Sequence, residues 1–182
     1  YDICPMQKYL IEGPEALAML DRMVSRDLNK LRINRVTYVA WCNDSGRMID
    51  DGTIFRLDES KFLLTCGSPC LAWLRKSALG FDQLSVIEHT EALAALSLQG
   101  PTSFAVLKAM GLEAAGSLKP FDIGHYPFAE GEIMISRTGF TGDLGYELWV
   151  EPYLALTLWD HLYEAGANYG IQPYGEAATN MA

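Results

Sequence analysis

The amino-acid sequence predicts an α+β protein made of two ferredoxin-like units, each a split β-α-β unit with an antiparallel sheet. The main observation is an internal repeat. An apolar strand end, a Gly-Pro pair and an amphipathic helical pattern occur together twice, at Gly13-Pro14 and at Gly100-Pro101. The two prolines are 87 residues apart (101 − 14), which suits one small α+β unit. The second observation is that both repeats continue into short stretches rich in β-branched and aromatic residues, separated by turn residues.

Both repeats begin in the same way for the same physical reason. Glycine supplies the tight turn after the strand, and proline suits the first helical position because its missing N–H would have no partner there. After the first repeat we expect strands at 36–42, 52–57 and 61–66, a helix at 71–79 and a strand at 84–88. After the second repeat we expect strands at 132–136 and 146–150 and a helix at 154–167.

The repeat also sets the expected domains. Residues 10–97 are expected to form the first α+β unit, and residues 1–9 together with 98–182 the second, discontinuous unit. A single larger α+β domain is the alternative, since a Gly-Pro pair can match by chance.

Composition and charge exclude several classes of protein. Apolar residues make up 49% and charged residues 20% of the 182 residues, as in ordinary globular proteins. The net charge of −9 argues against nucleic acid as a partner, because phosphate binding depends mainly on Lys and Arg. No apolar run is long enough to span a bilayer, and the N-terminus lacks the basic and apolar regions of a signal peptide. We therefore expect no membrane partner and a cytoplasmic location, or the mitochondrial matrix in a eukaryote.

The cysteines and histidines do not indicate a disulfide framework or a metal site. Cys4, Cys42, Cys66 and Cys70 are too few for a framework in a chain of this size. The three histidines are isolated from them and from one another, so no metal site is predicted. We expect buried or half-buried thiols in a reducing compartment.

The ends of the sequence predict an internal fragment of a longer protein. The chain opens without an initiator Met, and it ends at residues 180–182 within a helical pattern that has no stop signal. Truncation of this kind exposes apolar surface, so self-association is expected to be favoured.

The first segment suited to chemistry is a turn that runs into two adjacent carboxylates, Asp50 and Asp51. Successive side chains on a strand point to opposite faces, so both carboxylates cannot face the core. One is expected to face solvent or to cap the turn, and the other to enter a cleft. A carboxylate there can orient an amine or stabilise a developing cation. The alternative is that both are ordinary turn acids.

The second segment, residues 136–148, contains three glycines and two threonines, which predicts irregular backbone close to a ligand. It is not a phosphate loop, because the Gly-Lys-Ser/Thr ending is absent. Glu147 lies just inside the following strand. If its face is covered, Glu147 is a buried acceptor that needs a donor, and the adjacent N–H groups of an aminopyrimidine would satisfy it. The alternative is an exposed Glu at the rim.

The third feature is Tyr38, within the apolar and aromatic run at 36–41. An aromatic side chain here can stack on a planar ligand. Packing within the sheet is the alternative for Tyr38 and the favoured interpretation for Trp41.

Together and in this order, these segments resemble the aminomethyltransferase family. That family includes the glycine-cleavage T-protein, the folate domains of dimethylglycine and sarcosine dehydrogenases, and folate-dependent S- and O-demethylases. The strongest element is 136–148, which is similar to the family's Ser-Arg-Thr-Gly-aromatic-Thr-Gly-acid-x-Gly-aromatic-Glu-Leu signature. Residues 98–101 and 48–51 are similar to comparable family segments in the expected order.

The resemblance implies a three-domain ring that binds tetrahydrofolate in a central channel, with the C-terminal barrel missing from this chain. It implies that Asp51 is the acid near the folate nitrogen that carries the one-carbon unit, and that Glu147 holds the pterin. It also implies that Tyr38 lines the channel, that Phe140 stacks where many relatives have Tyr, and that Arg137 of the signature contacts the cofactor.

Three departures from the family pattern bear on the donor. Gly46-Arg47 stands where relatives have Gly-Gly, residues 3–6 lack a histidine, and Gly67 stands where an Asn is frequent. The departures favour a demethylase modestly over the glycine-cleavage reaction.

Four functional hypotheses follow from the resemblance. The first is transfer of a one-carbon unit from a small-molecule or lipoyl-carried donor to tetrahydrofolate. The second is a folate-dependent S- or O-demethylase. The third is a folate-binding module of a larger flavin-dependent protein similar to dimethylglycine or sarcosine dehydrogenase, and a catalytically inactive relative is the fourth.

Overall fold

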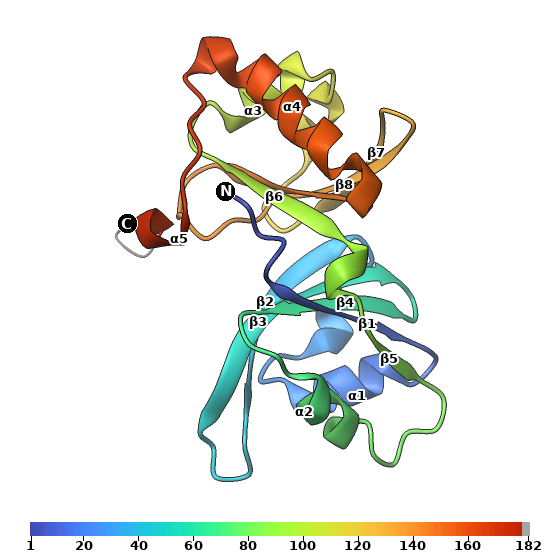
Figure 1. Ribbon diagram of the computed structural model, residues 1–182. Helices are drawn as coiled ribbons and strands as arrows, with labels where there is room; N and C mark the ends of the chain where they lie inside the picture. The colour runs from blue at the N-terminus through green and yellow to red at the C-terminus, as the bar shows by residue number, and fades with distance from the viewer. Residues whose placement is uncertain (180–182) are drawn as a thin grey trace. The chain divides into compact units, whose positions relative to one another are not determined.

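The computed structural model describes residues 1–179 and is an α+β protein with two antiparallel sheets, as the sequence predicts (Figure 1). The chain divides into two compact units. One is Met6–Thr90, and the other is Tyr1–Pro5 together with the chain from Glu91 onward. No helix within the described part of the chain is long and apolar enough to cross a membrane.

The unit Met6–Thr90 contains a five-stranded antiparallel sheet with the strand order β2-β3-β4-β1-β5. The helices α1 and α2 lie together on one face of it (Figure 1). Its elements, in chain order, are β1 (Gln7–Glu12), α1 (Ala16–Met23), a 3-10 turn (Leu28–Lys30), β2 (Arg35–Cys42), β3 (Met48–Asp58), β4 (Lys61–Cys66), α2 (Leu71–Ser77) and β5 (Ser85–Glu88). Alternate strand residues, among them Tyr9, Trp41 and Phe62, are fully buried in the core between sheet and helices.

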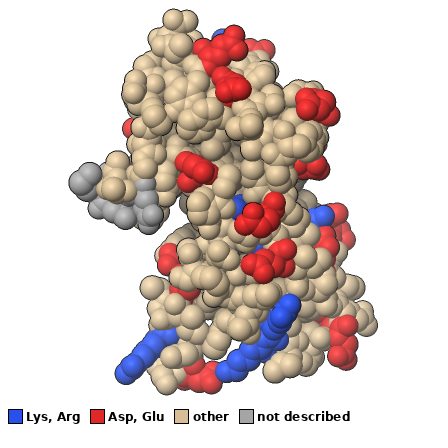
Figure 2. All heavy atoms as spheres, viewed as in Figure 1, with Lys and Arg blue, Asp and Glu red and all other residues tan. Residues whose placement is uncertain are grey.

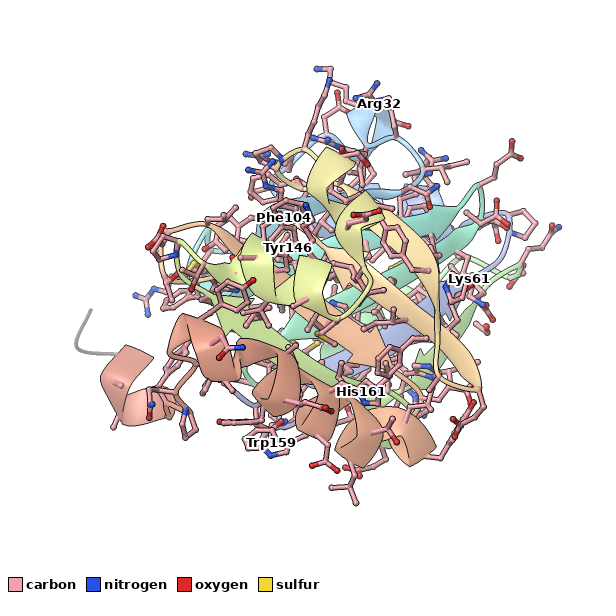
Figure 3. The ribbon with its side chains drawn as sticks, turned by 90° about the horizontal axis from the view of Figure 1, so that it is seen from above. Arg32, Lys61, Phe104, Tyr146, Trp159 and His161 are labelled. Carbon is pink, nitrogen blue, oxygen red and sulfur yellow. The ribbon has the colours of Figure 1, made fainter. Side chains whose placement is uncertain are left out.

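The other unit contains a four-stranded antiparallel sheet with the order β6-β9-β8-β7. Its elements are β6 (Ala94–Gln99), α3 (Ser103–Ala109), β7 (Ile123–Phe128), β8 (Gly131–Ser136), β9 (Gly145–Val150), α4 (Ala155–Gly166) and α5 (Glu176–Thr179), with 3-10 turns at Thr90–Ala92, Glu113–Ser117, Pro152–Leu154 and Ala167–Tyr169. Phe104 of α3 and Tyr146 of β9 pack in the core on the helical face (Figure 3). His161 of α4 meets Phe128 edge to face, with ring centroids 5.4 Å apart.

The predicted repeat is present in the topology. The order β1-β4-β3-β2 in one sheet corresponds to β6-β9-β8-β7 in the other, and each first strand leads into a helix through a Gly-Pro turn. Both glycines have a positive φ, +131° at Gly13 and +115° at Gly100, which is why glycine is needed at each turn. The two units therefore share a core of one strand, one helix and three further antiparallel strands. In Met6–Thr90, β4, α2 and β5 also form a split β-α-β unit, because β1 lies between the two strands.

The N-terminal residues occupy the place beside β6 that β5 occupies beside β1. Asp2 forms an antiparallel bridge with Leu96. The backbone N–H of Ser97 donates to the carbonyl of Tyr1 at 2.7 Å, and the N–H of Ile3 donates to the carbonyl of Ala95 at 3.1 Å. Tyr1 and Ser97, which are 96 residues apart in sequence, thus meet at the edge of β6, and the N-terminal segment covers that edge.

The observed unit boundaries lie earlier than the expected ones, at residues 6 and 91 where 10 and 98 were expected. The register explains the difference. All of β1 from Gln7 pairs with β4, and all of β6 from Ala94 pairs with β9, so neither strand is divided between units.

One strand, β7, was not predicted from the sequence. It contains Gly124 and Pro127, residue types that are rare inside strands. In the structure β7 pairs only with β8 and forms an edge of the sheet, where a proline that cannot donate is tolerated.

The acidic side chains are spread over the surface. Figure 2 shows Asp and Glu scattered over the visible face of both units, with no basic patch among them. This distribution on the visible face fits the net charge of −9.

Candidate functional site

The first candidate site is built around Glu147 on β9. The strand alternates, so Tyr146 and Leu148 enter the core under the helices while Glu147 points to the opposite face of the sheet. Ser136 of β8 and Ser97 of β6 are its direct neighbours across the two adjacent strands. Glu147 therefore lies on the sheet face away from α3 and α4.

Hydroxyl groups, rather than a cation, hold the Glu147 carboxylate. Its Oε2 accepts from Thr138 Oγ1 at 2.5 Å and from Ser136 Oγ at 3.4 Å. The single hydroxyl hydrogen of Ser136 is shared between Glu147 Oε2 and Thr138 Oγ1, which lies 2.7 Å away, and Ser136 Oγ accepts from the indole N–H of Trp149 at 3.2 Å. Within residues 1–179 no Lys or Arg pairs with Glu147. The described part of the chain thus holds this carboxylate with neutral hydroxyl donors.

Burial of the carboxyl raises the pKa of Glu147, and the hydrogen bonds from Thr138 and Ser136 oppose that rise. Both hydroxyls reach Oε2, so Oε1 keeps its acceptor capacity. Oε1 is not among the buried atoms that lack a hydrogen bond within the described residues, so it is open to a donor from a ligand.

The glycine-rich loop that covers this region is fastened by Gln99 at the end of β6. Its Nε2 donates to Ser97 Oγ at 2.9 Å and to the carbonyl of Thr138 at 3.3 Å, and its Oε1 accepts from Thr141 Oγ1 at 3.3 Å. A side chain at Gly139 or at Gly145 would overlap the Gln99 amide. A side chain at either position would therefore move the Gln99 amide away from its hydrogen bonds to the loop.

The other two residues predicted from this loop are placed differently. Phe140 is 82% exposed, so its ring is free to meet a ligand. Arg137 directs a guanidinium nitrogen to the carbonyl of Leu118 at 2.8 Å. It follows Ser136 in the chain and so points away from the sheet face of Glu147. The structure does not bring Arg137 to that carboxylate.

The second candidate site, in the unit Met6–Thr90, is a hydrogen-bonded pair on neighbouring strands. The Tyr38 hydroxyl on β2 donates to Asp51 Oδ2 on β3 at 2.7 Å. Asp51 lies opposite Ala40, and Tyr38 opposite Thr53, so both side chains share the sheet face that the helices leave open. Tyr38 is 51% exposed, and its hydrogen bond to Asp51 raises the pKa of its phenol.

The two adjacent carboxylates do separate as strand alternation predicts. Asp50 turns back, accepting the backbone N–H of Asp51 at 2.9 Å and that of Ser68 at 3.3 Å. Arg47 lies in the exposed hairpin turn four residues before Asp51, a separation of roughly 13 Å along an extended strand.

Sequence reasoning missed three residues of the candidate site. Ser136 and Thr138 hold the carboxylate, and Gln99 holds the loop. The first two belong to the segment 136–148, and Ser136 at the end of β8 lies directly opposite Glu147 in β9. Gln99 had no signal of its own, since it acts from a strand at the far side of the loop.

The fold and the two polar sites define an α+β protein in which a core of one strand, one helix and three further strands is duplicated. Its candidate carboxylates lie on the sheet faces that the helices leave open. The chain belongs to the GCVT N-terminal domain family, whose model matches residues 1–182. The family resemblance inferred from the sequence is therefore confirmed, while the residue assignments that rest on it stay predictions.

Individual proteins similar to this chain agree with the family. An aminomethyltransferase of Halothermothrix orenii is 33% identical over 98% of this chain and 50% of its own length. A trimethylamine-oxide aldolase of Ruegeria pomeroyi is 35% identical over 99% of this chain and 24% of its own length. The crystal structure of the glycine cleavage system aminomethyltransferase T of Bartonella henselae matches with a TM-score of 0.78 at 30% identity, covering 89% of this chain and 44% of that one. The chain thus spans about half the length of the aminomethyltransferases it matches.

Proposed function

We propose that the protein containing this chain transfers a one-carbon unit to tetrahydrofolate, as an aminomethyltransferase. Its family and its relatives named as aminomethyltransferases support this function. The observation that carries the proposal is Glu147, a half-buried carboxylate whose Oε2 accepts hydroxyl hydrogen bonds and whose Oε1 meets no donor among residues 1–179.

The residues present fit a folate pterin. Its aminopyrimidine edge offers adjacent N–H donors, which suit a carboxylate that lacks a cation and has an acceptor oxygen to spare. Glu147 is the proposed anchor, Phe140 offers an exposed ring for stacking, and Gln99 keeps the loop in place. Arg137 is the weakest assignment, because its guanidinium already holds Leu118.

Asp51 is proposed to act at the reacting centre. Tetrahydrofolate, when bound, supplies the amine nitrogen that accepts the one-carbon unit. The Asp51 carboxylate would stabilise positive charge that develops there, since a fixed charge aimed at a developing one needs little reorganisation. The hydrogen bond from Tyr38 fixes the orientation of Asp51 and leaves its other oxygen available.

The donor is proposed to be a small molecule or a lipoyl-carried aminomethyl group, and the protein is proposed to work in the cytoplasm. A folate-dependent S- or O-demethylase is the alternative within the family. A second candidate is a one-carbon-accepting module of a larger protein, favoured by the Ruegeria pomeroyi relative, of which the match covers only 24%. The products separate the first two, because methylene- and methyl-folate differ in oxidation state.

Calorimetric titration of the full-length protein with tetrahydrofolate tests the anchor. We expect saturable binding that Glu147→Gln weakens at least about 100-fold, the order of a lost charge-assisted pair of hydrogen bonds. The matched control is Glu132→Gln on the neighbouring strand β8, where the carboxylate is exposed and bonds only His125 at 2.9 Å. The control is expected to bind as the wild type does.

Two results would contradict the proposal. Absence of binding by well-folded wild-type protein would remove the folate function altogether. Equal binding by wild type and Glu147→Gln would keep folate as the ligand but remove Glu147 as its anchor.

A further inference from the structure

We propose that Cys66 and Cys70 form a reversible intramolecular disulfide, a modification site distinct from the proposed folate chemistry. Cys66 is the last residue of β4, and Cys70 immediately precedes α2. The two sulfur atoms are 3.5 Å apart, and both residues are buried, with exposures of 1% and 6%. The other two cysteines differ from this pair, since Cys42 is exposed and Cys4 is half-buried.

The geometry requires only a small closing movement. A disulfide bond is about 2.05 Å long, so the sulfurs must approach by roughly 1.5 Å. The residues between them, Gly67 to Pro69, are exposed, and nothing lies near the Cβ position of Gly67. This short loop can therefore adjust without displacing the core.

The surroundings favour thiol chemistry over metal binding. No group of three or more His, Cys, Asp and Glu side chains within the described residues could hold a metal ion, so the pair has no further ligand beside it. The two sulfurs share one hydrogen bond, which lowers the pKa of Cys70 and raises that of Cys66. The Tyr9 hydroxyl accepts a hydrogen bond from the backbone N–H of Cys70 at 2.9 Å, and this hydroxyl also lowers the pKa of Cys70. Cys70 is also the less buried of the two, with an exposure of 6% against 1% for Cys66, so we assign Cys70 as the sulfur that meets the oxidant and Cys66 as the resolving thiol.

The proposed oxidant is a hydroperoxide. The Cys70 thiolate attacks the terminal peroxide oxygen, the O–O bond breaks, and Cys70 sulfenic acid and an alcohol or water form once the leaving oxygen is protonated. Cys66 then loses its proton and attacks the Cys70 sulfur. The S–O bond breaks, water leaves, and the S–S bond forms. The two cysteines are oxidised together by two electrons, and the peroxide is reduced. A thiol such as dithiothreitol reverses the step.

The loop between the two cysteines is linked to the strand that carries Asp51. The backbone N–H of Ser68 donates to Asp50 Oδ2 at 3.3 Å, and Asp50 directly precedes Asp51 on β3. A movement of this loop on disulfide formation would therefore act on Asp50, the residue next to Asp51.

Peptide mapping of the full-length protein tests the proposal. The protein is treated with hydrogen peroxide, unfolded without reductant, alkylated with iodoacetamide and digested. We expect a peptide containing both Cys66 and Cys70 that is unalkylated and lighter by two hydrogen atoms, and that becomes doubly alkylated after dithiothreitol. Cys42→Ser is the control variant, and it is expected to form the same cross-link.

Recovery of Cys66 and Cys70 as alkylated thiols, as separate sulfinic acids, or in disulfides with Cys4 or Cys42 would overturn the proposal. The decisive sample is the wild-type protein, so the test does not depend on the folding of a cysteine variant. It also does not depend on folate binding, which can fail independently.

Discussion

At the scale of the residue, the ionised Glu147 carboxylate is expected to lower the stability of the fold. The chain places the carboxyl among neutral donors, and burial raises its pKa above the ordinary value of 4.5. Between the unfolded and the folded pKa, the native state binds more protons than the unfolded state. Stability therefore falls as pH rises through that window, and the full cost persists above it.

This sign gives a stability prediction for Glu147→Gln. The variant removes the ionisable group while keeping the shape of the side chain. We expect the variant to unfold at higher denaturant concentration than the wild type at about pH 8, with the difference shrinking toward about pH 4, where the wild-type carboxyl becomes protonated. Urea unfolding across this range measures it. Glu132→Gln, at an exposed position on β8, should show no such dependence on pH. A wild type more stable than Glu147→Gln at every pH would contradict the expected direction of the stability change.

Asp51 allows the chemical step to be separated from binding. If it stabilises charge at the reacting centre, Asp51→Asn should lower kcat by about 100- to 1000-fold and change folate affinity by less than about threefold. Steady-state kinetics with calorimetry on the same preparation measure both. Asp58→Asn, at the exposed far end of β3, is the matched control and should be neutral. A parallel loss of kcat and affinity would make Asp51 a binding residue instead.

At the scale of elements, the loop between β8 and β9 depends on a residue from a third strand. The Gln99 amide hydrogen-bonds the carbonyls of Thr138 and Tyr146, and it fills the space beside Gly139 and Gly145. The loop that bears Phe140 is thus positioned from β6. Local turn preference alone does not position it.

Substitution of Gly145 tests this dependence. Gly145→Ala should destabilise the protein by about 1–3 kcal/mol, because the added methyl overlaps the Gln99 amide. Gly67→Ala, where the Cβ position is open, is the control and should cost much less. The double variant Gln99→Ala/Gly145→Ala should cost less than the sum of the single variants in a double-mutant cycle. Strict additivity would show that Gln99 does not set the requirement for glycine.

The elements that the sequence predicted are those whose apolar residues recur in a pattern set by burial of one face. The strand β4 was placed at its observed limits, Lys61–Cys66, because its apolar run is buried. The strand β7 was not predicted because it forms by pairing with β8 alone. Gly124 and Pro127 within it are residue types that do not indicate a strand. Local motifs also predicted Glu147 and Asp51 as site residues, and these assignments stay predictions. The hydrogen bond of Gln99 to the loop is a tertiary contact, which a local sequence pattern does not reveal.

At the scale of the whole molecule, the chain closes one unit by returning its first residues to the edge of β6. The N–H of Ser97 donates to Tyr1, while its strand neighbours Leu96 and Leu98 point their N–H groups toward β9. Ile3 adds a buried side chain to this contact, with an exposure of 5%.

Hydrogen exchange measures how firmly this segment is held. Ile3→Pro removes the donor to Ala95 and the buried side chain. We expect faster exchange of the Ser97 amide, with the amides of Leu96 and Leu98 nearly unchanged as internal controls. Equal acceleration of all three would mean that β6 opens as a whole and that the segment is not a separate cover for its edge.

The same return of the chain has a consequence for biosynthesis. Tyr1 leaves the ribosome 96 residues before Ser97, its partner on β6. At about 5–20 residues per second, the nascent segment waits roughly 5–20 seconds for that strand to be made. In that interval Met6–Thr90 is complete and contains every strand of its own sheet. The intervening unit can therefore fold cotranslationally while the first residues stay unpaired, and the β6 edge is sealed only after the ribosome has passed it.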